Sequence, residues 1–97
     1  MASDALNPLA RTAISMPATR AVESKRRDAL FVDPLAAPLA GERAVAWLER
    51  QSVVISFWPV IRTRFLDDLL GHWMQQTFIR QVVLLAAGLD TRAYRLT

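Results

Sequence analysis

The sequence predicts an α/β fold in which a helical region leads into the first strand of a parallel sheet. Apolar residues recur at three- and four-residue spacing over residues 56–75, which is typical of a helix with one wide apolar face. The run QVVLLA, residues 81–86, is too short for a helix and is apolar on both faces, as strands buried inside parallel sheets are. The small-residue loop AAGLD follows it directly.

The length of 97 residues suits one small domain or a piece of a larger one. A hydrophobic content of 53% is more than a self-contained small domain needs, which suggests apolar faces that something else covers. One buried strand cannot form a sheet, so its neighbours must come from later sequence or from another chain. We therefore expect a truncated folding unit with an irregular segment at 1–17 and one incomplete domain at 18–97.

Three helical segments are expected before the long helix. Residues 18–30 contain good helix formers, and Pro17 stands at their start, where proline is favoured. The residue before Pro34 is pushed out of the helical region, so Asp33 can cap a short helix that begins at Pro34 and ends at Gly41. Residues 42–51, ERAVAWLERQ, predict another turn or two of helix.

The strongest helix spans residues 56–75 and carries both an apolar face and a polar edge. Arg64 and Asp68 are four residues apart and can pair on the solvated side. Asp67 is expected on the same solvated edge, and His72 is expected at the surface. The residues of the apolar face are Trp58, Ile61, Phe65, Leu66, Leu69, Leu70 and Trp73.

Composition excludes several classes of protein. The chain has no cysteine and a single histidine, which excludes disulfides, thiolate metal sites, cysteine nucleophiles and His-rich metal sites. The N-terminus has no continuous apolar core of the signal-peptide kind, and the longest apolar run is broken by Ser56 and Pro59. We therefore expect a cytoplasmic protein with no membrane partner.

The net charge of +3 raises the question of nucleic acid. Basic residues are spread along the chain, and the tightest cluster, SKRRD, is flanked by Glu23 and Asp28. All 12 basic residues except Lys25 are arginine, which favours carboxylate pairing as much as phosphate binding. We therefore expect no nucleic-acid partner.

Three stretches in order, TRAVES…ALFVDPLA, RTRFLDDLL and QVVLLAAGLDTRAYRL, make the chain resemble the leucine carboxyl methyltransferase family from Ala13 onward. They are most similar to its bacterial branch of S-adenosylmethionine-dependent O-methyltransferases, and GLDTRAYRL is a specific signature. The resemblance implies the class I methyltransferase fold, a seven-stranded Rossmann-like sheet with an added N-terminal helical region. It implies S-adenosyl-L-methionine as the cofactor.

The loop after the predicted strand is the first candidate cofactor site. The backbone there must approach the methionyl part of the cofactor, so side chains have to be small, as in Ala86, Ala87 and Gly88. The resemblance places a family glycine at Ala86, and this chain departs from it by one methyl group. Gly88 remains as the residue able to take a positive φ.

Two arginines are further cofactor-binding candidates. The resemblance implies that an arginine in the helix before the first strand holds the cofactor carboxylate, and Arg62 in IRTRFLDD matches it. A guanidinium suits this task because it can offer two parallel donors to a carboxylate. Arg62 lies on or beside the apolar face and is expected to point roughly inward; Arg64, its competitor, faces solvent. Arg20 is the third candidate, with a solvated helix arginine as the alternative. Asp90 can cap the next turn or bind Arg92 or Arg95.

No catalytic residue, metal ligand or acceptor site is assigned from the sequence. The acid that binds the cofactor ribose in Rossmann-type sites lies about 20 residues past the glycine loop, and nine residues follow Gly88. The expected function is methyl transfer from S-adenosylmethionine to a carboxylate or hydroxyl of a small molecule, with this fragment inactive alone. The alternative is a small helical interaction or dimerisation module that self-associates through its unpaired strand.

Overall fold

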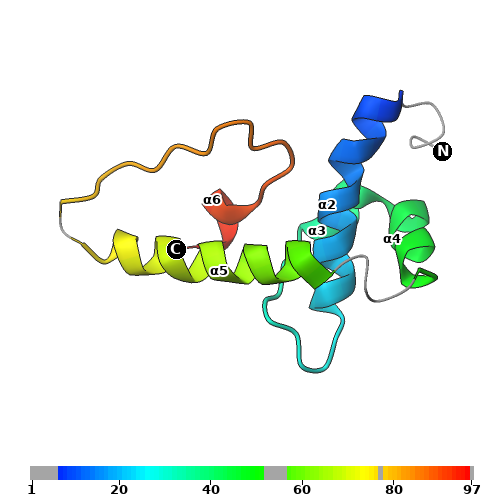
Figure 1. The fold of residues 1–97 in the computed structure, drawn as a ribbon, viewed down its shortest axis with the longest axis horizontal. Helices are drawn as coiled ribbons and strands as arrows, with labels where there is room; N and C mark the ends of the chain where they lie inside the picture. Colours follow the sequence, from blue (N-terminus) through cyan, green and yellow to red (C-terminus); the bar gives the residue numbers. More distant parts are fainter. Residues whose placement is uncertain (1–6, 52–56, 77, 97) are drawn as a thin grey trace.

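The computed structural model describes residues 7–51, 57–76 and 78–96, and within them the secondary structure is helical. The elements in order are α2 (Pro8–Ser24), α3 (Ala36–Ala40), α4 (Glu42–Glu49), α5 (Phe57–Met74) and α6 (Arg92–Arg95). Helices α2, α3 and α4 form one group, and α5 extends away from it with the loop before α6 returning above it (Figure 1). None of these helices is long and apolar enough to cross a membrane.

Helix α2 begins ten residues earlier than the sequence predicts. Asn7 caps it by accepting a hydrogen bond at Oδ1 from the Ala10 N–H at 2.8 Å, and Pro8 occupies the first turn. The prediction of an irregular segment is therefore wrong for residues 8–17, because the Asn-Pro pair is a start signal and Pro17 lies inside the helix. Residues 1–6 of that segment lie outside the described part of the chain.

Helix α2 also ends earlier than expected, at Ser24 and not at residue 30. The Glu23 carboxylate accepts a hydrogen bond from the Leu30 N–H at 2.8 Å, which turns the chain back on itself. Arg26 pairs with Glu23 and with Asp28 in the same turn. Local side-chain bonds to the backbone therefore compete successfully with continuation of the helix.

Helices α3 and α4 form where the sequence predicts helix, but the predicted start of α3 is wrong. The helix begins at Ala36, two residues after Pro34, and Leu35, not Asp33, stands at its N-cap. Asp33 accepts a hydrogen bond at Oδ1 from the Leu35 N–H at 3.0 Å, which begins the turn that leads into α3. Gly41 separates the two helices with a φ of 87°, in the region that favours glycine.

Small side chains form the apolar core between α2, α3 and α4. Because alanine adds only one carbon beyond the backbone, the helices can approach one another closely around it. Ala36 is completely buried at the centre of the cluster. The buried members are Ala18, Ala21, Ala36, Ala40 and Val45.

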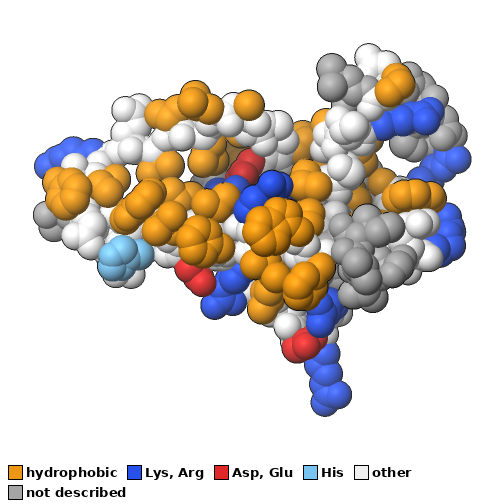
Figure 2. Space-filling model, viewed as in Figure 1, with side chains coloured by type: hydrophobic (Ala, Val, Ile, Leu, Met, Phe, Trp, Pro, Cys, Tyr) orange, Lys and Arg blue, Asp and Glu red, His pale blue; other side chains and the backbone are white. Residues whose placement is uncertain are grey.

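Helix α5 has the predicted extent over the described residues, but the aromatic residues of its predicted apolar face are exposed. Trp58 is 68% exposed and Phe65 62%, whereas the buried positions are Val60 and Asp67. Apolar side chains spread over this side of the molecule in Figure 2, along α5 and the segment above it. The spacing identified the helix correctly, but it did not identify the face that meets the rest of the chain.

The run predicted to be a strand, residues 81–86, does not form one among the described residues. Residues 79–84 are non-helical and pass above α5 in Figure 1, and no strand occurs anywhere in the described residues. The side chains of the predicted strand, residues 81–86, are exposed, with Leu85 at 87%. A strand is defined by hydrogen bonds to a neighbouring strand, and the described chain supplies none.

The alanine core predicts a sharp difference between two neighbouring substitutions. Ala36→Leu puts three more carbons into a fully buried site and should lower the free energy of unfolding by about 1–3 kcal/mol. Ala37→Leu makes the same change at an exposed position of the same helix and should change it by less than about 0.5 kcal/mol. Urea unfolding followed by circular dichroism measures both. Equal effects would contradict close packing around Ala36.

Candidate functional site

The loop Ala86–Thr91 has the backbone conformation that the sequence predicts for a close approach. Gly88 has a φ of 57°, which confirms the expected positive value, and Ala86 has a φ of 51°. A Cβ atom at Gly88 would meet no atom within 4 Å, so the space beside this backbone is open. The loop turns through a hydrogen bond from the Asp90 N–H to the Ala87 carbonyl at 3.1 Å.

Arg20 holds this loop from the side of α2. Its Nε donates to Asp33 Oδ2 at 2.9 Å, and its Nη2 donates to the Leu89 carbonyl at 2.5 Å. Arg20 is only 9% exposed, so the alternative of a solvated helix arginine is wrong. One side chain therefore connects α2, the turn before α3 and the candidate cofactor loop.

Asp33 is the acceptor at the centre of this arrangement, and its side chain is completely buried. Besides Arg20, Oδ2 accepts a hydrogen bond from Thr91 Oγ1 at 2.5 Å, and Arg95 Nε lies 3.7 Å away. Burial raises the pKa of Asp33, but the hydrogen bonds from Thr91, Arg20 and the Leu35 N–H, with the charge of Arg20, bring it below its usual value. Asp33 is therefore held as a carboxylate.

A second buried carboxylate, Asp67 of α5, holds α6. Arg92 Nε donates to Asp67 Oδ1 at 2.9 Å, and Arg95 Nη1 donates to Asp67 Oδ2 at 2.8 Å. The prediction of a solvated Asp67 is wrong, because the two arginines bury it to 8% exposure. Arg92 and Arg95 are three residues apart on one helical turn, and this spacing was the available signal for a shared acceptor.

Asp90 behaves as the sequence predicts. Its Oδ1 accepts from the Arg92 N–H at 2.8 Å, which starts α6, and its Oδ2 pairs with the Arg92 guanidinium. The resulting cluster contains three carboxylates and three guanidinium groups, so its formal charges cancel. No buried side-chain nitrogen or oxygen among the described residues lacks a hydrogen-bond partner. The members are Arg20, Asp33, Asp67, Asp90, Arg92 and Arg95.

Arg62 is exposed, although the sequence placed it pointing roughly inward. Its Nη2 lies 3.8 Å from the Met16 sulfur, and among the described residues no carboxylate lies within ion-pair distance of it. The expected inward direction is wrong, because Trp58 and Phe65 of the apolar face beside it are themselves exposed. Arg64, by contrast, pairs with Asp68 as predicted, with Nε 2.9 Å from Oδ2. His72 is exposed, as expected.

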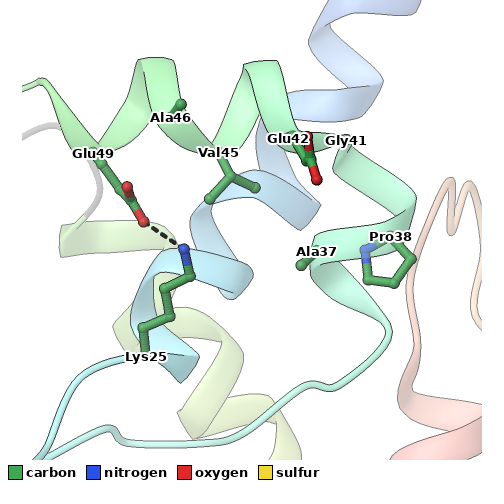
Figure 3. A pocket seen from close by; sticks show the side chains of 8 residues that line it. All are labelled: Lys25, Ala37, Pro38, Gly41, Glu42, Val45, Ala46 and Glu49. Carbon is green, nitrogen blue, oxygen red and sulfur yellow. Dashed lines mark hydrogen bonds and ion pairs between the residues drawn. The ribbon is translucent and has the colours of Figure 1, made fainter.

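Two cavities lie away from the loop. One of about 480 Å³ lies beside α3 and α4, where Figure 3 shows the Lys25–Glu49 ion pair of 2.7 Å at one side. A larger groove of about 920 Å³ runs between α2 and α4. No residue of Ala86–Thr91 lines either, and the described residues hold no cluster of three acidic or histidine side chains that could bind a metal. The candidate site is therefore the exposed loop.

A model of the leucine carboxyl methyltransferase family matches residues 13–97. The chain belongs to this family. It is 43% identical over 98 residues to a Streptomyces coelicolor protein named "putative S-adenosyl-L-methionine-dependent methyltransferase", with 88% of this chain and 33% of that protein covered. It is 48% identical over 94 residues to a protein of the same description from Frankia alni, with 89% and 33% covered.

A plant relative carries a more specific name. The chain is 40% identical over 81 residues to O-methyltransferase 1, chloroplastic, of Oryza sativa, with 77% of this chain and 22% of that protein covered. The chain thus spans about a third of the length of the bacterial relatives it matches. No solved structure matches it significantly.

The buried Asp33 predicts that the chain loses stability in acid. Its pKa is lower in the folded chain than the value of about 4 in the unfolded chain, so its stabilising contribution is complete above about pH 5. That contribution is lost as the pH falls below 4 and through the lowered folded-state pKa. Asp33→Asn should be less stable at neutral pH and should lose less of its remaining stability in acid.

Urea unfolding between about pH 7 and pH 2.5 measures this difference. Asp68→Asn is the matched control, because it makes the same chemical change in an exposed ion pair on α5. It should keep the acid-dependent loss of the wild type. An Asp33→Asn curve that runs parallel to the wild type at all pH values would contradict the assigned role of this carboxylate.

Proposed function

We propose that this chain provides the methionyl-binding part of an S-adenosylmethionine-dependent methyltransferase that methylates an oxygen of a small molecule. Membership of the family and the names of the bacterial relatives support the cofactor and the reaction. The name of the plant relative, an O-methyltransferase, supports oxygen as the acceptor atom. The observation that carries the proposal is the open loop with positive φ at Ala86 and Gly88.

The open backbone of this loop fits the amino-acid end of the cofactor. Ala86, Ala87 and Gly88 are exposed and carry at most one side-chain carbon, so a ligand can reach their backbone N–H and C=O groups. Arg62 is the candidate partner of the cofactor carboxylate, since it is exposed and has no carboxylate partner among the described residues. Arg20 lies directly behind the loop through its bond to Leu89.

The run at 81–86 is proposed as the first strand of a Rossmann-like sheet. Its side chains from Val82 onward are apolar, and the run is exposed on both faces, as expected of a strand whose neighbours lie outside the described residues. In that fold, ligands bind at the carboxyl ends of the strands, and the loop Ala86–Thr91 is at that end of this run. The strand and the loop therefore support the same location for the cofactor.

The bound cofactor would supply an electrophilic methyl group on its sulfonium sulfur. The residues of this chain would contribute by holding the amino-acid end of the cofactor in one orientation, which is the positioning part of catalysis. The chain offers no assigned general base and no assigned acceptor pocket. Its proposed role is therefore binding and orientation.

A second candidate function is an interaction or dimerisation module. The exposed apolar run is the observation in its favour, with Val83 at 68% and Leu85 at 87% exposure. Size-exclusion chromatography together with hydrogen exchange tests it. A dimer that protects the amides of residues 81–86 and has no affinity for the cofactor would favour the module over the methyltransferase.

Calorimetric titration with S-adenosylhomocysteine, the demethylated product, tests the proposed function. The wild-type chain should bind it, and Arg62→Ala should weaken binding by about tenfold to a hundredfold, the range for losing a hydrogen bond between charged groups. Arg27→Ala, which removes an exposed arginine from the turn after α2, is the control and should leave the affinity unchanged. Absence of binding by the wild type would contradict the proposal.

Ala86→Gly is expected to relieve backbone strain in the loop and to raise its affinity for the ligand. An alanine at a φ of 51° costs about 1 kcal/mol that glycine does not incur. The substitution also restores the residue that the family resemblance places there. S-adenosylhomocysteine affinity should rise up to about fivefold, measured by the same titration. Ala93→Gly, at an exposed position of α6, is the control and should not increase affinity.

A further inference from the structure

Leu89 and Thr91, which follow Gly88, are both linked to the carboxylate of Asp33. Asp33 Oδ2 accepts from Thr91 Oγ1 directly, and it accepts from Arg20, whose Nη2 donates to the Leu89 carbonyl. Leu89 and Thr91 are two residues apart, so the hydrogen bonds close a ring around Asp90. We call Arg20, Asp33 and Thr91 the clamp.

The clamp acts where the loop has little apolar support. Residues 81–88 are exposed, so apolar burial does not hold them in one conformation. The clamp residues, by contrast, are buried, with Thr91 at 2% and Asp33 at 2% exposure. The loop therefore has a rigid attachment immediately after its exposed part.

The same attachment extends to α6. Thr91 Oγ1 accepts a hydrogen bond from Arg95 Nε at 2.9 Å while it donates to Asp33. Arg95 also lies over the Phe31 ring, with its guanidinium carbon 5.9 Å from the ring centre. The hydroxyl of Thr91 is thus the point at which the clamp and α6 are joined.

We propose that Arg20, Asp33 and Thr91 are positioning residues that set the conformation of the loop Ala86–Asp90 for the cofactor. The significance for the cofactor rests on the proposed function. Arg20 acts through Leu89: its Nε and Nη2 are engaged, its charge is paired with Asp33, and only 9% of its surface is exposed. The N-terminal helix thereby controls the geometry of a distant loop, since Arg20 and Leu89 are 69 residues apart in the sequence.

Substitution of Thr91 tests the clamp with little change in shape. Thr91→Val replaces the hydroxyl with a methyl group and removes the hydrogen bonds to Asp33 and Arg95, whereas Thr91→Ser keeps the hydroxyl. Hydrogen exchange is followed at the amides of Tyr94, Arg95 and Leu96, which bond to carbonyls at the start of α6. Thr91→Val should speed their exchange by about tenfold to a hundredfold, and Thr91→Ser should restore it to near the wild-type rate.

The Val45 amide of α4 is the internal reference, because it bonds to the Gly41 carbonyl away from the loop. Its exchange should not change in Thr91→Val; an equal rise there would show a general loosening and would overturn a local clamp. An unchanged exchange rate at the α6 amides of Thr91→Val would also overturn the clamp. Faster exchange that persists in Thr91→Ser would overturn it as well.

Titration with S-adenosylhomocysteine separates the clamp from the proposed function. If the clamp positions the cofactor loop, Thr91→Val should also bind about tenfold or more weakly, with recovery in Thr91→Ser. If the wild type does not bind, the proposed function fails, while the exchange measurement still decides whether the clamp exists. Unchanged affinity in Thr91→Val despite faster exchange would overturn the positioning role.

Discussion

The carboxylate of Asp33 connects α2, the entry to α3 and the loop that precedes α6. Arg20 reaches it from α2, Thr91 reaches it from the loop, and the Leu35 N–H binds it at the entry to α3. A buried charge of this kind is tolerated only when partners replace the water it has lost. Removal of the carboxylate would leave Arg20 buried and unpaired, so the cost would extend to both sides of the cluster.

The molecule is held together in two different ways. Helices α2, α3 and α4 pack through small apolar side chains around Ala36, which is ordinary core packing. Helix α6 is held by ion pairs, because Asp67 of α5 binds both Arg92 and Arg95 while large apolar side chains of α5 remain exposed. The candidate loop therefore depends on charged and hydrogen-bonded contacts for its place, and its environment is more sensitive to acid than the alanine core.

Local features were predictable from the sequence, and long-range pairing was not. The positive φ of Gly88, the Asp90–Arg92 contact and the Arg64–Asp68 pair each depend on residues within a few positions of one another. Burial of Arg20 and Asp67 depends on partners up to 69 residues away, which no local pattern specifies. Helix α5 shows the same limit, since the spacing of its apolar residues gives a helix but not the side that meets α2. The family resemblance identified the loop and singled out Arg20, but it did not identify Asp33 and Thr91 as supports of the loop.

The positive φ of Ala86 depends on the contacts that hold the loop. A non-glycine residue at positive φ stores about 1 kcal/mol of backbone strain, and such strain persists only where the surroundings fix the chain. Here the fixed points are Leu89 and Thr91, which the clamp holds just after the strained residue. A loop held only by solvent contacts would relax by rotating Ala86 to a negative φ, and the open backbone beside Gly88 would be lost. The family glycine removes the strain at its source, whereas this chain, with alanine in its place, depends more on the clamp to keep the loop in a form that a ligand can enter.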